Sequence, residues 1–341
     1  MKKQFILLGL GSALVLSGCG GGGGSSGTTT GAGAGAPVAT PVSTLSSVTT
    51  ANATQVAASA YASSVALSDS SAPVNGLLTG VSIDGARAGA VAPVLSLVRK
   101  VYPRTTPLLT GVVMTEACTG GGTMTVDANL RNQQTISNGD TLKITANNCV
   151  EDGVVINGSM SIAMSNITGD IVNSYNWSAT LDTTFSNFTA RSGNETAGIG
   201  GDMKIAMAQT SMSNSTINVS GKSLQLVEQR NGLTLGTYTL SNYTMNETVN
   251  GAAVSSAASF SIAGNSSGLG QFSYTVKNLQ PFVSIGMGNP SSGSLIVNGA
   301  SSSVTLTSAS TSSVRLEYSA KGDGVITQIS NLSWAELLAA L

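Results

Sequence analysis

The fold is decided by a stretch in which apolar and polar residues alternate, Trp177-Ser-Ala-Thr-Leu-Asp-Thr-Thr-Phe185. Successive side chains of an extended chain point to opposite faces, so the odd-numbered residues, Leu181 and Thr183 among them, share one face. The polar residues between them share the other face. A period of two predicts a strand with one buried and one solvated face, as in an antiparallel sheet.

The same alternation returns along the chain after Pro107. It recurs at Met160–Met164, Met203–Met207, Phe272–Val276 and Val314–Tyr318. Pairs of Asn and Gly, which favour tight turns, separate many stretches of this kind: Asn138-Gly139, Asn157-Gly158, Asn231-Gly232, Asn250-Gly251 and Asn298-Gly299.

These patterns predict a mainly β protein with about twelve or more short strands in hairpin spacing. A flat sheet of that size twists too far, so we expect a large curled antiparallel sheet, either barrel-like or a sandwich. An outer-membrane pore is the competing interpretation of alternating strands. The aromatic content of 4% is low for the aromatic girdles that such a pore carries, so a β-domain outside the bilayer is favoured.

One or two helices are predicted before the strands. From Thr50 to Ser68 the chain is rich in Ala, Val56, Ala60 and Leu67 recur at helical spacing, and Thr50 is the expected N-cap. A second helix is predicted from Gly89 to Val101. The expected organisation is therefore a helical N-terminal segment at residues 43–107 and an antiparallel β-domain at residues 108–341.

The β-domain is expected to close with a short helix. Ser333 and Glu336 have the spacing of a capping box, in which each residue satisfies a backbone N–H group of the other. Trp334 is expected to anchor this helix to the sheet.

Composition excludes several classes of function. The 341 residues include no His, which removes Ser-His-Asp and Cys-His nucleophiles and His-ligated zinc or haem. With 15 Lys and Arg against 16 Asp and Glu, and no basic block, no nucleic-acid partner is expected. No cofactor, no metal site and no catalytic residue is predicted.

The N-terminus has the features of an export signal. Lys2 and Lys3 precede an apolar run, Phe5–Leu16, which is too short to span a bilayer. Residues 1–18 are therefore predicted to be a signal peptide. Residues 19–42 consist mostly of Gly, Ser, Thr, Ala and Pro, and are predicted to form a flexible tether.

The end of this signal, Leu16-Ser-Gly-Cys19, resembles the lipobox of bacterial lipoproteins. The resemblance implies that Cys19 is acylated and becomes the first mature residue, with the lipid bilayer as its partner. The residue after Cys19 is Gly20 and not Asp, which would signal retention. In this respect the chain resembles lipoproteins that Gram-negative cells send to the outer membrane. The resemblance leaves open whether the chain faces the periplasm or the cell surface.

Two further cysteines, Cys118 and Cys149, remain in the predicted exported chain. Thiols in an oxidising compartment usually pair, so a disulfide is expected. A redox-active or metal-binding pair is the alternative, although such pairs normally have closer spacing.

A broader resemblance covers most of the mature chain. The segments Cys118–Val126, Asn147–Cys149, Gly293–Ala300 and Trp334–Leu337 resemble uncharacterised Gram-negative outer-membrane lipoproteins. The resemblance implies the same β-rich fold and membrane address, and it carries no established activity.

The function that these observations favour is a non-enzymatic envelope role, either structural or binding an apolar ligand. The expected ligand-lining residues on the concave face of the sheet are Met160, Ile162, Trp177, Leu181 and Phe185.

Two alternatives stay open. A hydrolase would use a pair of carboxylates from the set Asp127, Asp140, Asp152, Asp182 and Asp202. A Cu(I) site would use thioethers from Met160, Met164, Met203 and Met207, which also suit a packed core.

Overall fold

A computed structural model describes residues 44–79, 112–131, 137–151, 153–169, 174–266, 268–286 and 288–341. These residues belong to one compact unit, Val42–Leu341. The predicted signal peptide, Cys19 and the whole predicted tether at residues 19–42 lie outside the described residues, as does the predicted helix Gly89–Val101.

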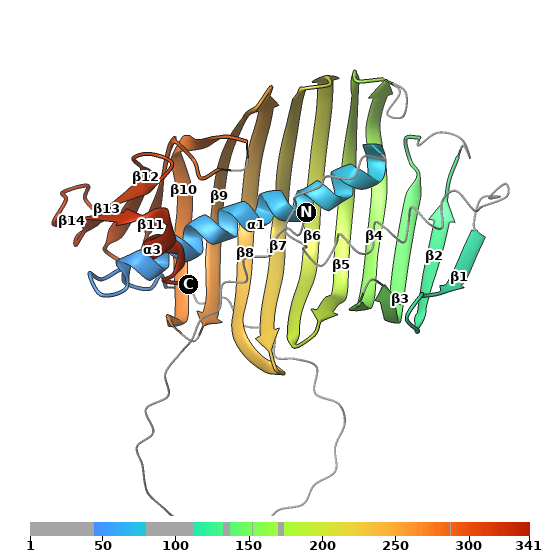
Figure 1. Ribbon diagram of the computed structural model, residues 1–341, viewed down its shortest axis with the longest axis horizontal. Coiled ribbons are helices and arrows are strands. Elements are labelled where there is room, and N and C mark those ends of the chain that lie inside the picture. Colours follow the sequence, from blue (N-terminus) through green and yellow to red (C-terminus); the bar gives the residue numbers. More distant parts are fainter. Residues whose placement is uncertain are drawn as a thin grey trace, which may run out of the picture. The chain divides into compact units, whose positions relative to one another are not determined.

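The described chain is dominated by a single antiparallel sheet of 14 strands (Figure 1), which confirms the mainly β prediction. Each strand pairs with the next strand in the sequence, and the sheet is not closed, so the first and last strands are its edges. The strands are β1 (Val112–Ala117), β2 (Thr123–Asn129), β3 (Thr141–Glu151), β4 (Val154–Gly169), β5 (Trp177–Ser192), β6 (Glu195–Ser211), β7 (Asn214–Arg230), β8 (Leu233–Asn250), β9 (Ala253–Ser266), β10 (Gly270–Ile285), β11 (Ser292–Asn298), β12 (Ser303–Ser308), β13 (Ser313–Ser319) and β14 (Gln328–Ser333).

The central strands are longer than the short strands that the sequence predicted, and one of them, β4, contains a predicted turn. Asn157-Gly158 is part of β4, at a shift in its register with β5. There Gly158 has a φ of 97° and packs against the backbone of Asn187, which itself has a φ of 48°. A side chain at residue 158 would collide with that backbone, so glycine permits a bulge where a turn was predicted. The other Asn-Gly pairs lie at strand ends or between strands.

One face of the sheet is apolar from β2 to β13. Paired residues in an antiparallel sheet point to the same side. The register places Leu181 beside Ile205, then Val219, Met245 and Ala258 on β5 to β9. The same residues belong to one buried cluster, whereas Ser, Thr and charged residues fill much of the opposite face.

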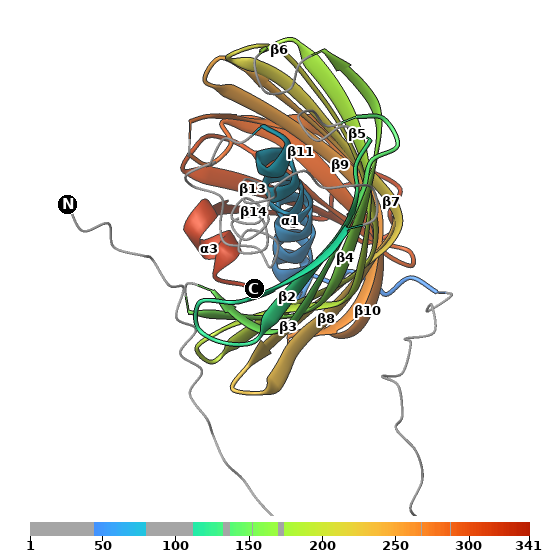
Figure 2. The same ribbon diagram turned by 90° about the vertical axis from the view of Figure 1, so that its right-hand side faces the viewer.

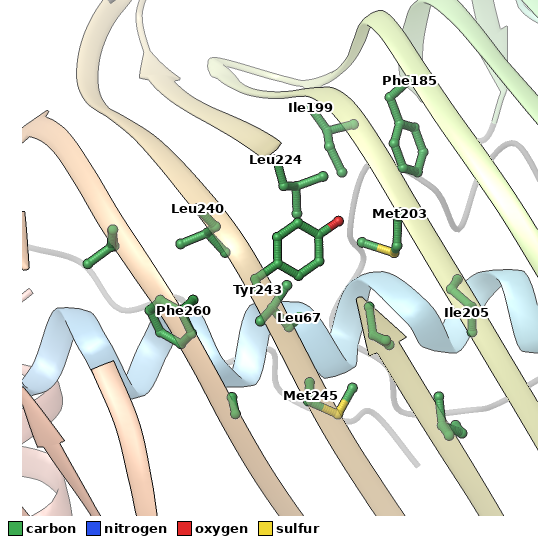
Figure 3. Packing of buried hydrophobic residues seen from close by; sticks show 14 of the residues in the cluster. Leu67, Phe185, Ile199, Met203, Ile205, Leu224, Leu240, Tyr243, Met245 and Phe260 are labelled. Carbon is green, nitrogen blue, oxygen red and sulfur yellow. The ribbon is translucent and has the colours of Figure 1, made fainter. Parts of the chain in front are cut away.

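Helix α1 (Ala53–Thr79) lies across this apolar face (Figure 1), and Figure 2 shows the sheet curving around it. The helix packs against β7–β9 and β11–β13. The predicted stripe is confirmed, since Val56, Ala60 and Leu67 are all buried. Figure 3 shows Leu67 on the same side of the sheet as apolar side chains from β5 to β9.

The two ends of α1 differ from the prediction. Asn52 donates its backbone N–H to the hydroxyl of Thr49, and Thr49 donates its own N–H to the side-chain oxygen of Asn52. This reciprocal pair closes a turn ahead of the helix, which begins at Ala53, three residues after the predicted N-cap Thr50. The helix also continues to Thr79, beyond the predicted end at Ser68.

The C-terminal helix α3 (Trp334–Leu338) forms as predicted. The Ser333 side chain accepts from the backbone of Glu336, and the Glu336 carboxylate accepts from the backbone of Ser333, which completes the capping box. Trp334 is buried, and its indole N–H donates to the carbonyl of Ser310 at 3.0 Å. Within the described part of the chain, neither helix has the length and apolar character needed to cross a membrane.

Candidate functional site

The five predicted ligand-lining residues lie together on the apolar face of β4 and β5. Their side chains are between 0 and 5% exposed. Met160 on β4 is the direct partner of Phe185 on β5. The strip from Trp177 to Phe185 covers eight residue steps, about 26 Å of an extended strand. An acyl chain, which spans half of a bilayer's hydrocarbon core, is about 15 Å long.

A bulge widens this strip at one end. Phe185 and Phe188 differ in their position in the alternation, yet both are buried. The register of β5 with β6 shifts between them, so both rings face the same side, with centroids 6.3 Å apart. The period of two could not have identified Phe188 as a member of the site.

Trp177 marks the other end of the strip. Its indole N–H donates to the side-chain oxygen of Gln209 on β6 at 3.0 Å, and the Gln209 amide donates to the carbonyl of Ser211. The single polar atom of Trp177 is therefore satisfied, and its ring contributes apolar surface to the face.

Methionines flank β5 on both sides. Met160 and Met164 on β4 and Met203 and Met207 on β6 are buried in the cluster on this face. Unbranched thioether side chains adapt to irregular shapes, and for that reason they suit both core packing and surfaces that bind varied apolar ligands. Among the described residues, no group of three or more His, Cys, Asp or Glu side chains is arranged to hold a metal ion.

Thr183 is a polar residue inside this strip. It is only 2% exposed, and its hydroxyl is a buried side-chain polar atom without a hydrogen-bond partner. Its direct partners on the neighbouring strands are Ile162 and Met203. The alternation along β5 predicts that Thr183 is buried. It does not predict that the hydroxyl lacks a hydrogen-bond partner, because that depends on side chains from other strands.

The cover over the face differs along α1. The segment just before α1 is held to the sheet: Ser46 exchanges hydrogen bonds with the backbone of Ser273 on β10, and the backbone N–H of Val48 donates to the hydroxyl of Ser302. Beyond Ser68 the helix contains Pro73 and Gly76, the two residue types least favourable in a helix interior. The end of α1 that runs toward β4 in Figure 1 therefore has the weaker intrinsic helix stability.

Most of the carboxylates that a hydrolase would need have structural partners. Asp140 is fully buried and accepts from the backbone N–H groups of Arg131 and Ser137, each at 2.8 Å. Asp182 forms an exposed ion pair with Lys204. Asp127 is exposed on β2, and Asp152 lies outside the described residues.

Asp202 makes hydrogen bonds across a register shift between β6 and β7. Its carboxylate accepts from the backbone N–H groups of Lys222 and Ser223, at 2.9 and 3.1 Å. Its carbonyl accepts from the hydroxyl of Tyr243, and burial, with a smaller contribution from Asp202, raises the pKa of that hydroxyl above its usual value.

A charged cluster that the sequence analysis did not single out lies where β6, β7 and β8 end. Arg230 bonds Glu195 at 3.0 Å, and Glu228 lies close by on β7. Although much of the Glu228 residue is exposed, partial burial of its carboxyl raises the pKa of that group; Arg230 lowers the pKa and Glu195 raises it further. Glu228 in turn raises the pKa of Tyr238, a smaller effect than that of burial.

The predicted disulfide is present between Cys118 and Cys149, whose Cα atoms are 5.3 Å apart. Next to it, the Glu151 carboxylate accepts from the backbone N–H and the hydroxyl of Thr119. The bond and this contact tie the hairpin of β1 and β2 to the end of β3.

A small hollow lies beneath the start of α1. It measures about 20 Å³ and is lined by residues that include Ala53, Leu316 and Tyr318. A space of that size holds about one water molecule. It is too small for an apolar ligand, so the strip on β4 and β5 is the stronger candidate.

Comparison of this chain with protein-family models, with curated proteins and with solved structures finds no match.

Proposed function

We propose that this chain is an envelope lipoprotein that binds the acyl chain of a lipid on the apolar face of its open sheet. The observation that carries the proposal is a continuous apolar face covered by a helix of mostly small side chains. The strip from Trp177 to Phe185 is the proposed binding surface, and the second half of α1 is the part of the cover that moves aside.

The energetics of α1 support a cover that can move. Burial of a large apolar side chain contributes about 1.5 to 3 kcal/mol, and burial of Ala much less. In Ala53–Leu67 the fully buried large side chains are Val56 and Leu67, and the other buried positions are Ala and Ser. These residues belong to the half of α1 that stays on the sheet. In Ser68–Thr79, the half proposed to move, Pro73 and Gly76 lower the intrinsic stability of the helix, and a bound acyl chain would replace the contacts of this half with the sheet.

The proposed attachment to the outer membrane is argued from the sequence alone. The lipobox Leu16–Cys19 supports acylation of Cys19 and attachment to the outer membrane, and residues 19–42 would serve as the tether. An anchor of this kind would hold the apolar face within reach of membrane lipids.

Lipid analysis of the purified full chain tests this proposal. We expect organic-solvent extraction to release about one non-covalent acyl lipid per chain, on the basis of a single strip of acyl-chain length. Leu181→Gln places a polar group in the strip and should lower that yield severalfold. Thr184→Gln, on the exposed face of the same strand, should leave the yield unchanged.

Circular dichroism of Leu181→Gln separates lost binding from lost folding, because the yield is compared only between folded samples. Wild-type protein that carries no stoichiometric lipid and takes up no added 1-palmitoylglycerol would contradict the proposal.

A further inference from the structure

The strip on β4 and β5 contains one side-chain polar atom that has no partner in the folded chain. Thr183 is 2% exposed, and its buried hydroxyl has no hydrogen-bond partner. The residues paired with it are Ile162 and Met203, and its neighbours on the same face of β5 are Leu181 and Phe185. An unpaired polar atom is thus surrounded by apolar side chains.

Several other buried hydroxyls among the described residues do have partners. The hydroxyl of Thr180, which the alternation of β5 places on the opposite face from Thr183, accepts a hydrogen bond from the side-chain amide of Asn166. Ser302 accepts from the backbone of Val48, and Ser308 donates to the carbonyl of Pro290. Native proteins rarely leave such a group unpaired, because the lost hydration is not replaced. Among the described residues that are not exposed, Thr183 is the exception, and it lies in the strip proposed to bind lipid.

We propose that the Thr183 hydroxyl donates a hydrogen bond to the carbonyl oxygen of an ester-linked acyl chain, and so fixes the position of a neutral acylglycerol on the strip. The inference rests on the proposed function and specifies its ligand class. A hydroxyl is both donor and acceptor, and a carbonyl at the end of an apolar chain is the simplest group that satisfies it without burying a charge.

The charges around Thr183 favour a neutral lipid over a free fatty acid. Its cross-strand partners are apolar, and the nearest charged pair along the sequence, Asp182 and Lys204, lies on the opposite, solvated face. A buried carboxylate would need a cationic partner, and the strip residues include no Lys or Arg.

Two probe lipids with the same alkyl-chain length and the same glycerol head group measure what the carbonyl contributes to binding. 1-Palmitoylglycerol contains the ester, and 1-hexadecylglycerol replaces it with an ether. Titrated into the full chain, wild-type protein should bind the ester about fivefold to tenfold more tightly than the ether, the effect of one neutral hydrogen bond.

Thr183→Val keeps the side-chain shape and removes the hydroxyl. We expect it to weaken ester binding about fivefold to tenfold and to leave ether binding unchanged. Thr183→Ser, which retains a hydroxyl, should restore the preference for the ester. Thr184→Val, on the exposed face, is the matched control and should behave as wild type.

The outcomes separate the two claims. Wild-type protein that binds ester and ether equally, or a Thr183→Val variant that keeps the preference, would overturn the role of Thr183 while lipid binding itself stands. Wild-type protein that binds neither probe would overturn the proposed function and this inference with it.

Discussion

Tyr61 of α1 packs edge-on against Phe282 of β10, with ring centroids 5.2 Å apart. Trp334 of α3 completes the cluster, 4.8 Å from the Tyr61 ring and 6.4 Å from the Phe282 ring. Three elements from distant parts of the sequence therefore meet at one point. This contact holds the first half of α1 on the sheet and leaves its second half outside the cluster.

Truncation of this ring tests how α1 is held. Tyr61→Ala removes both aromatic contacts, and we expect a loss of about 2 to 3 kcal/mol in the free energy of unfolding. Urea denaturation followed by near-ultraviolet circular dichroism measures it. Tyr175→Ala removes an exposed tyrosine and should cost less than about 0.5 kcal/mol. Equal stability of the two variants would show that the aromatic cluster does not hold α1.

The disulfide should contribute strongly to stability. Its cysteines are 31 residues apart, and a loop of that size stabilises the folded state by about 3 to 4 kcal/mol in the chain-entropy model. The double variant Cys118→Ala/Cys149→Ala should lose that amount in urea denaturation, and a reducing agent should then have no further effect on it. A double variant as stable as oxidised wild type would contradict the expectation.

Asp140 should be a structural carboxylate and not a catalytic one. It closes the segment between β2 and β3 through two backbone N–H groups, so Asp140→Ala should lower the free energy of unfolding by about 2 to 3 kcal/mol. Asp127→Ala, which removes an exposed acid from β2, should change it by less than about 0.5 kcal/mol. An Asp140→Ala variant with the same free energy of unfolding as wild type would show that these hydrogen bonds do not stabilise the fold.

Glu228 gives a prediction with a defined pH dependence. Its pKa is raised in the folded state, mainly by burial, so the ionised carboxyl destabilises the fold. That cost is present above the folded pKa and disappears as the pH falls below the unfolded pKa. Glu228→Gln should therefore be more stable than wild type at pH 8, by less than about 1 kcal/mol because the group is partly exposed.

The difference between Glu228→Gln and wild type should vanish near the unfolded pKa of about 4. Thermal unfolding across this pH range measures it. A variant that is less stable than wild type at pH 8 would mean that attraction to Arg230 outweighs the effect of burial.

The alternation of residues predicted which apolar side chains of β5 are buried as far as Phe185, although Thr180, on the polar face, is buried as well. It failed at Phe188, because the bulge at Asn187 shifts the period by one residue, and such bulges depend on contacts with β4 and β6. Similarly, Asn157-Gly158 has the local composition of a turn, but its neighbours extend β4 through it. Patterns along one strand do not report the register of its neighbours.

The sequence likewise predicted only part of the candidate site. Met160, Leu181 and Phe185 follow from local alternation, and the structure brings them together as expected. The missing partner of Thr183 could not be predicted, because it depends on the side chains of Ile162 and Met203 from two other strands. The cluster around Glu228 has the same origin, since its three charges come from β6 and β7.

Hydrogen–deuterium exchange of the full chain with and without saturating 1-palmitoylglycerol tests the central claim most directly, since it reports the cover and the strip together. If an acyl lipid replaces the second half of α1 on the sheet, exchange should become faster in Ser68–Thr79 and slower in the backbone of β4–β6. Exchange that stays unchanged in both regions at saturating lipid would contradict the account, because the helix would then be a permanent part of the core.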